Sequence, residues 1–135
     1  MRNKTLVEIC CGSAEDAIEA WHGGADRVEL CSALFLGGLT PSLGALLELK
    51  AQAEIEVAAM IRPRQGGFCY SKSDFRTALN DAELMLQHGA DALVVGFLLE
   101  DGRVDLARTR AVVELADKVP VCFHRAIDVV PDWRE

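Results

Sequence analysis

Hydrophobic and polar positions along the chain follow two different periods. Five short runs are rich in apolar and β-branched residues, and four longer stretches between them repeat apolar residues at helical spacing. The predicted strands are residues 6–10, 27–31, 56–61, 92–95 and 119–123. Because a helical stretch follows each of the first four strands, the pattern predicts a parallel α/β sheet built from crossover connections.

The predicted helices begin at side chains that can accept backbone hydrogen bonds. These N-caps are Ser13, Thr40, Ser71 and Asp105. Thr40 precedes Pro41, and proline is favoured in the first helical position. Two helices also end alike, since Gly24-Ala25-Asp26 and Gly89-Ala90-Asp91 each lead directly into a strand. This recurrence indicates repeated strand–helix units.

The direction of the side chains distinguishes a closed barrel from an open sheet. Alternation along each strand places polar or sulfur-bearing residues on one face, opposite the apolar face. The pairs that share this polar face are Glu8 with Cys10, Glu29 with Cys31, Met60 with Arg62, and Cys122 with His124. An open doubly wound sheet is covered by helices on both faces, and both should be apolar. A barrel instead gathers polar residues at the carboxyl ends of its strands.

The predicted fold is therefore a parallel (β/α) barrel of the TIM type. Such a barrel needs about eight strand–helix units, and this chain supplies the first five strands and four helices. We expect residues 1–135 to form a single unit, the N-terminal half of a (β/α)8 barrel, because no linker or low-complexity stretch divides them. A half barrel has two unpaired edge strands, so we also expect a homo-oligomer.

Composition and net charge exclude some classes of binding partner. Half of the 135 residues are hydrophobic, and the net charge is -7. That charge repels nucleic-acid backbones and anionic lipids, so we expect neither nucleic acid nor membrane as a partner. The first residues contain no signal-peptide core, which favours a cytoplasmic protein. Five cysteines without CxxC spacing predict reduced thiols.

Cys10 and Cys31 end neighbouring predicted strands at equivalent positions. Neighbouring strands lie ~4.8 Å apart, so two inward thiols there can face one another. Two such thiolates suit Cu(I), which accepts few ligands and prefers sulfur. The spacing alone favours packing in the core over metal binding, because free cysteine behaves as a small hydrophobic residue.

Charged residues at the ends of the strands predict a binding pocket. The candidate catalytic residues are Glu8, Glu29, Arg62, His124 and Asp128, and the candidate ligand-binding residues are Thr40, Arg62, Arg64 and Arg125. Asp128 follows His124 by four positions and can orient it as a general base. The arginines favour a carboxylate or phosphate. Two alternatives remain open: a buried Glu8–Arg62 ion pair, and arginines paired with surface acids in an exposed turn.

Five motifs in order resemble the CutC family of copper homeostasis proteins over the N-terminal portion of that family. They are Val7-Glu8-Ile9-Cys10, the segment from Gly24 to Cys31, the segment from Gly37 to Ser42, Ile61-Arg62-Pro63-Arg64, and Phe123-His124-Arg125-Ala126. The resemblance implies a (β/α) barrel and Cu(I) binding by two cysteines, whose positions match Cys10 and Cys31.

Three functional hypotheses follow. The first is a cytoplasmic copper homeostasis protein that binds Cu(I) through Cys10 and Cys31 at the rim of the barrel. The second is a barrel enzyme that acts on a small anionic substrate, with glutamate and histidine residues as acid–base groups. The third is a scaffold without catalysis.

Overall fold

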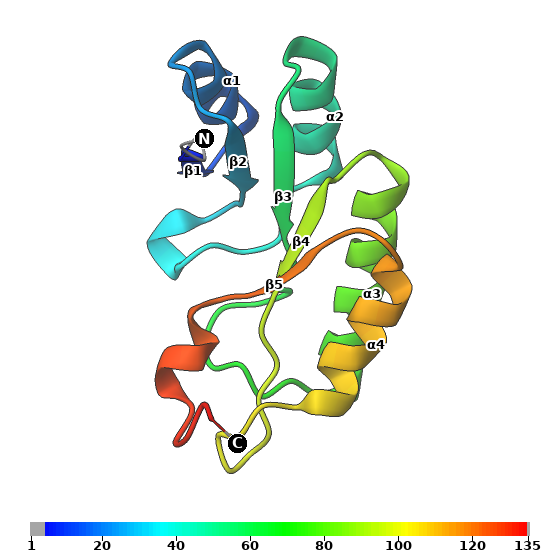
Figure 1. The fold of residues 1–135 in the computed structure, drawn as a ribbon. Helices are drawn as coiled ribbons and strands as arrows, with labels where there is room; N and C mark the ends of the chain where they lie inside the picture. The colour runs from blue at the N-terminus through cyan, green and yellow to red at the C-terminus, as the bar shows by residue number, and fades with distance from the viewer. Residues whose placement is uncertain (1–4, 135) are drawn as a thin grey trace.

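The computed structural model describes residues 5–134, in which five strands and four α-helices alternate along the chain (Figure 1). The strands are β1 (Glu8–Cys11), β2 (Arg27–Leu30), β3 (Glu56–Met60), β4 (Ala92–Val95) and β5 (Val121–Phe123). The α-helices are α1 (Ala14–His22), α2 (Leu43–Gln52), α3 (Lys72–Gln87) and α4 (Leu106–Ala116). Two short 3-10 helices, η1 (Leu34–Leu36) and η2 (Arg125–Val129), follow β2 and β5 and were not expected from the sequence.

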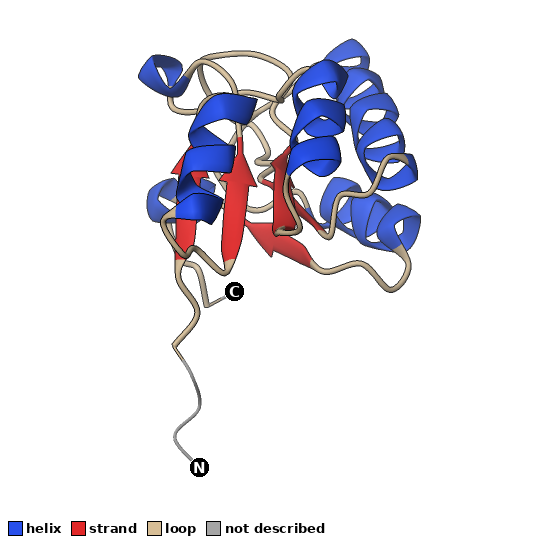
Figure 2. Cartoon of the chain, turned by 90° about the horizontal axis from the view of Figure 1, so that it is seen from above, coloured by secondary structure: helices blue, strands red, loops and turns tan. Residues whose placement is uncertain are grey.

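All five strands are parallel, and each pairs with the next strand along the chain, in the order β1-β2-β3-β4-β5. This sequential order is that of a barrel wall, whereas an open doubly wound sheet reverses its order at a switch point. The order confirms the predicted parallel α/β class. Figure 2 shows the strand directions turning progressively across the sheet.

The two faces of the sheet differ as alternation predicts. Side chains of β2, β3 and β4 that face the helices join the main core, which includes Leu30, Val57 and Leu93. The opposite face carries a separate buried cluster of small and sulfur-bearing side chains, namely Cys31, Ala58, Met60, Ala92 and Val94. The α-helices therefore cover one face of the sheet, and the other face is left to form a site.

Three of the four predicted helix caps are confirmed. The side chains of Ser13, Ser71 and Asp105 accept hydrogen bonds from backbone N–H groups of α1, α3 and α4. The predicted cap Thr40 is wrong, because α2 begins later and Ser42 caps it. Thr40 is used elsewhere: its hydroxyl accepts the N–H of Arg62 at 2.9 Å, which ties the β2–α2 connection to the end of β3.

The ends of the strands differ from the prediction by one or two residues. β1 runs from Glu8 to Cys11, so Cys11 belongs to a strand and not to the following loop. Its side chain is 1% exposed and packs in the main core on the helix side. The strand is only one residue longer at this end than predicted. Alternation along it places the consecutive cysteines on opposite faces of the sheet, and of these two only Cys10 faces away from the helices.

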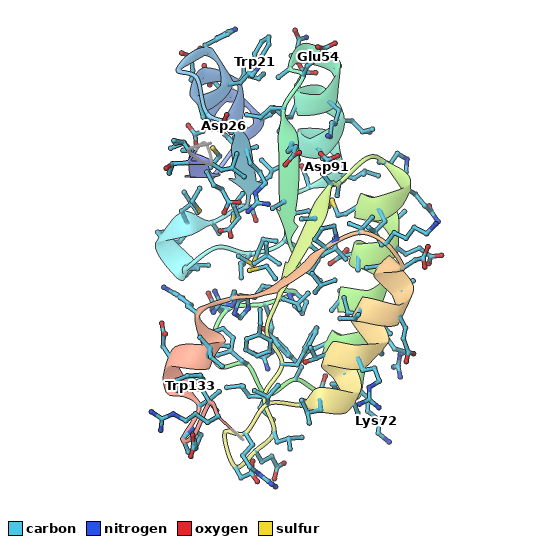
Figure 3. The ribbon with its side chains drawn as sticks, in the orientation of Figure 1. Trp21, Asp26, Glu54, Lys72, Asp91 and Trp133 are labelled. Atoms are coloured by element: carbon cyan, nitrogen blue, oxygen red, sulfur yellow. The ribbon has the colours of Figure 1, made fainter. Side chains whose placement is uncertain are left out.

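The repeated Gly-Ala-Asp segments have the same structural role at two strand starts. Asp26 and Asp91, both labelled in Figure 3, accept the backbone N–H groups of Val7 and Val57 at 3.0 and 2.8 Å. In each case the acceptor precedes one strand, and the donor lies at the start of the preceding strand: Val7 comes directly before β1, and Val57 is in β3. Lys50 of α2 also contacts the Asp91 carboxylate, at 2.6 Å. These aspartates fix the register of neighbouring strands at the end remote from the candidate site.

Candidate functional site

A cavity of about 310 Å³ lies at the carboxyl ends of the strands, on the face of the sheet opposite the α-helices. Its lining includes Cys10 from β1, Glu29 from β2, Arg62 after β3, and His124 and Arg125 after β5. Alternation of side chains along strands explains why residues so distant in sequence meet here. The thiol of Cys10 comes from β1 and the carboxylate of Glu29 from β2. The guanidinium groups come from the segments after β3 and β5.

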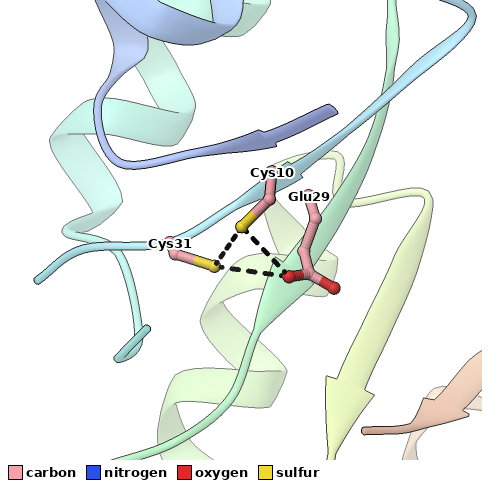
Figure 4. A group of neighbouring side chains, drawn as sticks. All are labelled: Cys10, Glu29 and Cys31. Atoms are coloured by element: carbon pink, nitrogen blue, oxygen red, sulfur yellow. Dashed lines mark hydrogen bonds between the residues drawn. The ribbon is translucent and has the colours of Figure 1, made fainter. Parts of the chain in front are cut away.

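Two thiols and one carboxylate form a compact group on the β1–β2 side (Figure 4). The register places Cys10 opposite Glu29, and Cys31 comes directly after β2, two residues beyond Glu29. The two Sγ atoms are 3.9 Å apart, and each thiol donates to Oε1 of Glu29, at 3.4 Å from Cys10 and 3.7 Å from Cys31. The three ligand atoms all lie within 4.8 Å of one another. This arrangement can hold a metal ion.

Burial and neighbouring charge keep both thiols protonated at neutral pH. Burial is the main cause that raises the pKa of Cys31, and its neighbours Cys10 and Glu29 raise it further. The pKa of Cys10 is raised first by burial and then by the charge of Glu29. A metal ion binds the thiolate form, so binding must release thiol protons. The apparent affinity for a metal therefore increases with pH.

Arg62 lines the same cavity and is only 5% exposed. Its Nη1 donates to the carbonyls of Leu36 and Gly38 at 2.8 and 3.1 Å, and its Nη2 donates to the carbonyl of Gly66 at 2.9 Å. The guanidinium also lies over the ring of Phe68. Its Nε is buried without a hydrogen-bond partner.

His124 is neutral and has one unused donor. Burial is the main cause that lowers its pKa to about 4, and the charge of Arg62 lowers it further. Its Nδ1 accepts the backbone N–H of Ala126 at 3.1 Å, so the hydrogen of the neutral ring is on Nε2. Nε2 is buried without a partner. Asp128 contacts neither ring nitrogen and is exposed on η2, so the predicted pairing of His124 with Asp128 is wrong.

Of the four residues predicted to converge in one pocket, three do so. Glu29, Arg62 and His124 line the same cavity, whereas Glu8 does not. Glu8 lies two residues before Cys10, at the start of β1, and a strand advances about 3.3 Å per residue. Its carboxylate pairs there with Arg27 of β2. The alternative of a buried Glu8–Arg62 ion pair is therefore wrong too.

Two predicted ligand-binding residues are occupied by structural contacts. Arg64 pairs with Asp74 at 3.0 Å and lies over the ring of Tyr70. Its other nitrogens donate to three carbonyls of its own loop. Thr40 accepts the N–H of Arg62, and neither Arg64 nor Thr40 lines the cavity. Of the predicted ligand-binding residues, Arg62 and Arg125 remain at the site.

Sequence reasoning missed the glycines that shape the cavity. A Cβ at Gly96 would lie 2.1 Å from Cε1 of His124, so only glycine allows the imidazole to take its place. Gly37 has a φ of 89° and lies against Arg125. Gly96 follows β4 and Gly37 follows η1, but no local pattern shows which distant side chain a glycine will contact.

The fold and the site together define an α/β protein of the barrel type with a thiol–carboxylate group at the carboxyl ends of its strands. The model of the CutC family matches residues 5–135, and the chain belongs to that family. It is 54% identical over 126 residues to a family protein CutC from Treponema denticola, covering 93% of this chain and 51% of that protein. It is 45% identical over 130 residues to a human protein named copper homeostasis protein cutC homolog, and the match covers 96% of this chain and 48% of that protein.

A solved structure shows the same fold. The crystal structure of a copper homeostasis protein CutC from Streptococcus agalactiae superposes with a TM-score of 0.86 at 34% identity, covering 95% of this chain and 62% of that one. This likeness confirms the predicted barrel-type wall. The chain spans about half the length of the curated relatives it matches. No helix within residues 5–134 has the length and apolar character needed to cross a bilayer.

Proposed function

We propose that this chain is a cytoplasmic copper homeostasis protein that binds Cu(I) as its cargo through the thiolates of Cys10 and Cys31. The observation that carries the proposal is the 3.9 Å separation of the two Sγ atoms, which come from neighbouring segments of the sheet. Membership of a family with relatives named for copper homeostasis, in human and mouse, supports the same function.

The donor set suits a soft monovalent ion. Cu(I) prefers sulfur and accepts few ligands, whereas a structural zinc site needs four nitrogen or sulfur ligands. The metal-competent group within residues 5–134 consists of two thiols and the Glu29 carboxylate. Because Glu29 accepts hydrogen bonds from both thiols, it is placed to take a proton when a thiol ionises.

The proposed location follows from the same chemistry. All five cysteines are free thiols. The cytosol keeps cysteines reduced, and Cu(I) binding by Cys10 and Cys31 requires reduced sulfur. Acid–base turnover is not part of the proposal, because Glu8 and Asp128, two acids that such a mechanism would use, do not line the cavity.

Competition with a chromophoric Cu(I) chelator under anaerobic conditions tests the proposal. We expect Cys10→Ser and Cys31→Ser each to weaken Cu(I) binding by at least about 100-fold, since loss of even an indirect contact to a metal typically costs 10–100-fold. Cys69→Ser is the matched control, because Cys69 is an exposed thiol in the loop after β3 and lies outside the group.

Cys122→Ser provides a second control inside the same cavity, since Cys122 lines it but is not part of the thiol–carboxylate group. Both control variants should keep the affinity of the unmodified chain. Equal Cu(I) affinity in all four variants would remove Cys10 and Cys31 as ligands and, with them, the proposal.

A further inference from the structure

The cavity also carries two positive charges that form no ion pair with a carboxylate of the described residues. They belong to Arg62 and Arg125, which both line it. Both guanidinium groups also lie beside the same glycine. A Cβ built on Gly37 would be 2.1 Å from Nη2 of Arg125 and 3.1 Å from Nη1 of Arg62. The two like charges are therefore neighbours.

The buried arginine is incompletely satisfied. Burying a charge is costly unless an opposite charge and hydrogen bonds compensate it. Three backbone carbonyls accept from the two Nη atoms of Arg62, but its Nε has no partner. A second arginine, the exposed Arg125, lies beside it, so an anion that enters the cavity meets two guanidinium charges.

His124 adds a neutral donor to the same cavity. Because Nδ1 accepts from Ala126, the ring hydrogen is on Nε2, which is buried and unpartnered. A neutral imidazole N–H can donate to an oxyanion without adding a third positive charge. The Nε2 donor of His124, which has no partner, and the guanidinium of Arg125 thus belong to side chains that line the same cavity as Arg62.

We propose that Arg62, His124 and Arg125 form a binding site for the oxyanion group, a carboxylate or a phosphate, of a small molecule. A guanidinium group can donate two parallel hydrogen bonds to a pair of oxygens of either oxyanion and carries the opposite charge. A cavity of about 310 Å³ is at the small end of the range for ligand sites. This site is distinct from the thiols and does not depend on copper binding.

The position of Glu29 restricts what can bind. Its carboxylate lies on the β2 side of the same cavity, beside the thiols. An anion near it would be repelled, so the ligand must carry its negative group at the arginine end and a neutral or cationic part toward Glu29. The negative charge of Glu29 and the positive charges of the arginines therefore select the orientation in which the ligand binds.

Isothermal titration of the purified chain with inorganic phosphate and, separately, with acetate tests the site. We expect saturable binding of at least one of the two anions, and the anion that binds more tightly identifies the chemistry. Arg125→Met should weaken that binding by at least about tenfold, because it removes a positive charge and its hydrogen bonds to the anion. No hydrogen bond within residues 5–134 involves the Arg125 guanidinium, so this variant should fold normally.

His124→Asn is the second variant, because its side-chain oxygen can still accept the N–H of Ala126 while the Nε2 donor is lost. It should weaken anion binding by about tenfold too. The matched control is Arg110→Met, which removes an exposed arginine of α4 outside the cavity. A variant with both Cys10→Ser and Cys31→Ser should keep full anion affinity, which separates this site from the proposed copper site.

Three results would overturn the proposal. One is the absence of saturable binding of either anion to the unmodified chain. Another is unchanged affinity in Arg125→Met and His124→Asn. The third is an equal loss in Arg110→Met, which would show a general effect of net charge.

Discussion

At the scale of single residues, burial decides the chemistry of the candidate site. The thiols of Cys10 and Cys31 and the imidazole of His124 all lie in or beside one cavity, and burial is the main cause of each pKa shift. All three shifts favour the uncharged form. The guanidinium of Arg62 is a fixed positive charge. The site at neutral pH therefore combines neutral thiols and a neutral histidine with fixed positive charge.

The lowered pKa of His124 predicts a dependence of stability on pH. The folded chain binds a proton at His124 only near pH 4, whereas the unfolded chain binds it near pH 6.5. Between these values the unfolded state holds more protons, so the contribution of this residue to stability is complete above pH 6.5 and is lost as pH falls toward 4. Urea unfolding at pH 7 and pH 5 should show a lower free energy at pH 5.

His124→Asn should reduce that difference, because asparagine does not titrate. The exposed His22→Asn is the control, since it removes a histidine on α1 away from the cavity. If His124→Asn and the unmodified chain lose the same free energy between pH 7 and pH 5, other groups cause the pH dependence.

At the scale of elements, the repeated aspartates align neighbouring strands. Asp91 accepts the N–H of Val57 and the ammonium group of Lys50. Substitution of Asp91 by alanine leaves the start of β3 without this acceptor. We expect the free energy of unfolding to fall by about 1.5–3 kcal/mol, the usual contribution of a hydrogen bond to a charged group.

Chemical denaturation of Asp91→Ala measures this loss. Asp117→Ala is a suitable control for the removal of a carboxylate, although its positive φ of 53° at the end of α4 adds a small conformational cost. The Asp91 prediction would fail if both variants were as stable as the unmodified chain.

At the scale of the whole molecule, the sheet has two open edges. β1 and β5 each pair with one neighbour only within residues 5–134. Along the β1 edge the side chains of Val7 and Ile9 are 47% and 42% exposed. Unpaired strand edges with apolar side chains associate with one another. We expect the 135-residue chain, taken by itself, to form dimers or larger assemblies in solution.

Sedimentation velocity over a range of concentrations tests that expectation. Ile9→Lys places a charge on the edge strand and should shift the distribution toward monomer. Leu84→Lys on α3 is the matched control, because Leu84 is similarly exposed but lies on a helix. A monodisperse monomer that unfolds cooperatively would contradict the prediction.

The sequence by itself determined the class of fold and which face of the sheet carries the chemistry. Both depend on local rules: helical period, strand alternation and capping residues act over a few neighbouring positions. Cys10, Glu29, Arg62 and His124 could therefore be assigned to one side of the sheet before any contact was known, and the structure places all four around one cavity.

Only the tertiary structure decided which charged groups remain available there. Glu8 pairs with Arg27, and Arg64 is held by its own loop, while Arg125 lies beside Arg62 without a carboxylate partner. These outcomes depend on distances through space between residues that are 10 to 88 positions apart, and on glycines whose partners no local pattern shows. Side-chain direction is a property of the strand, but the partner that a charge meets is a property of the folded chain.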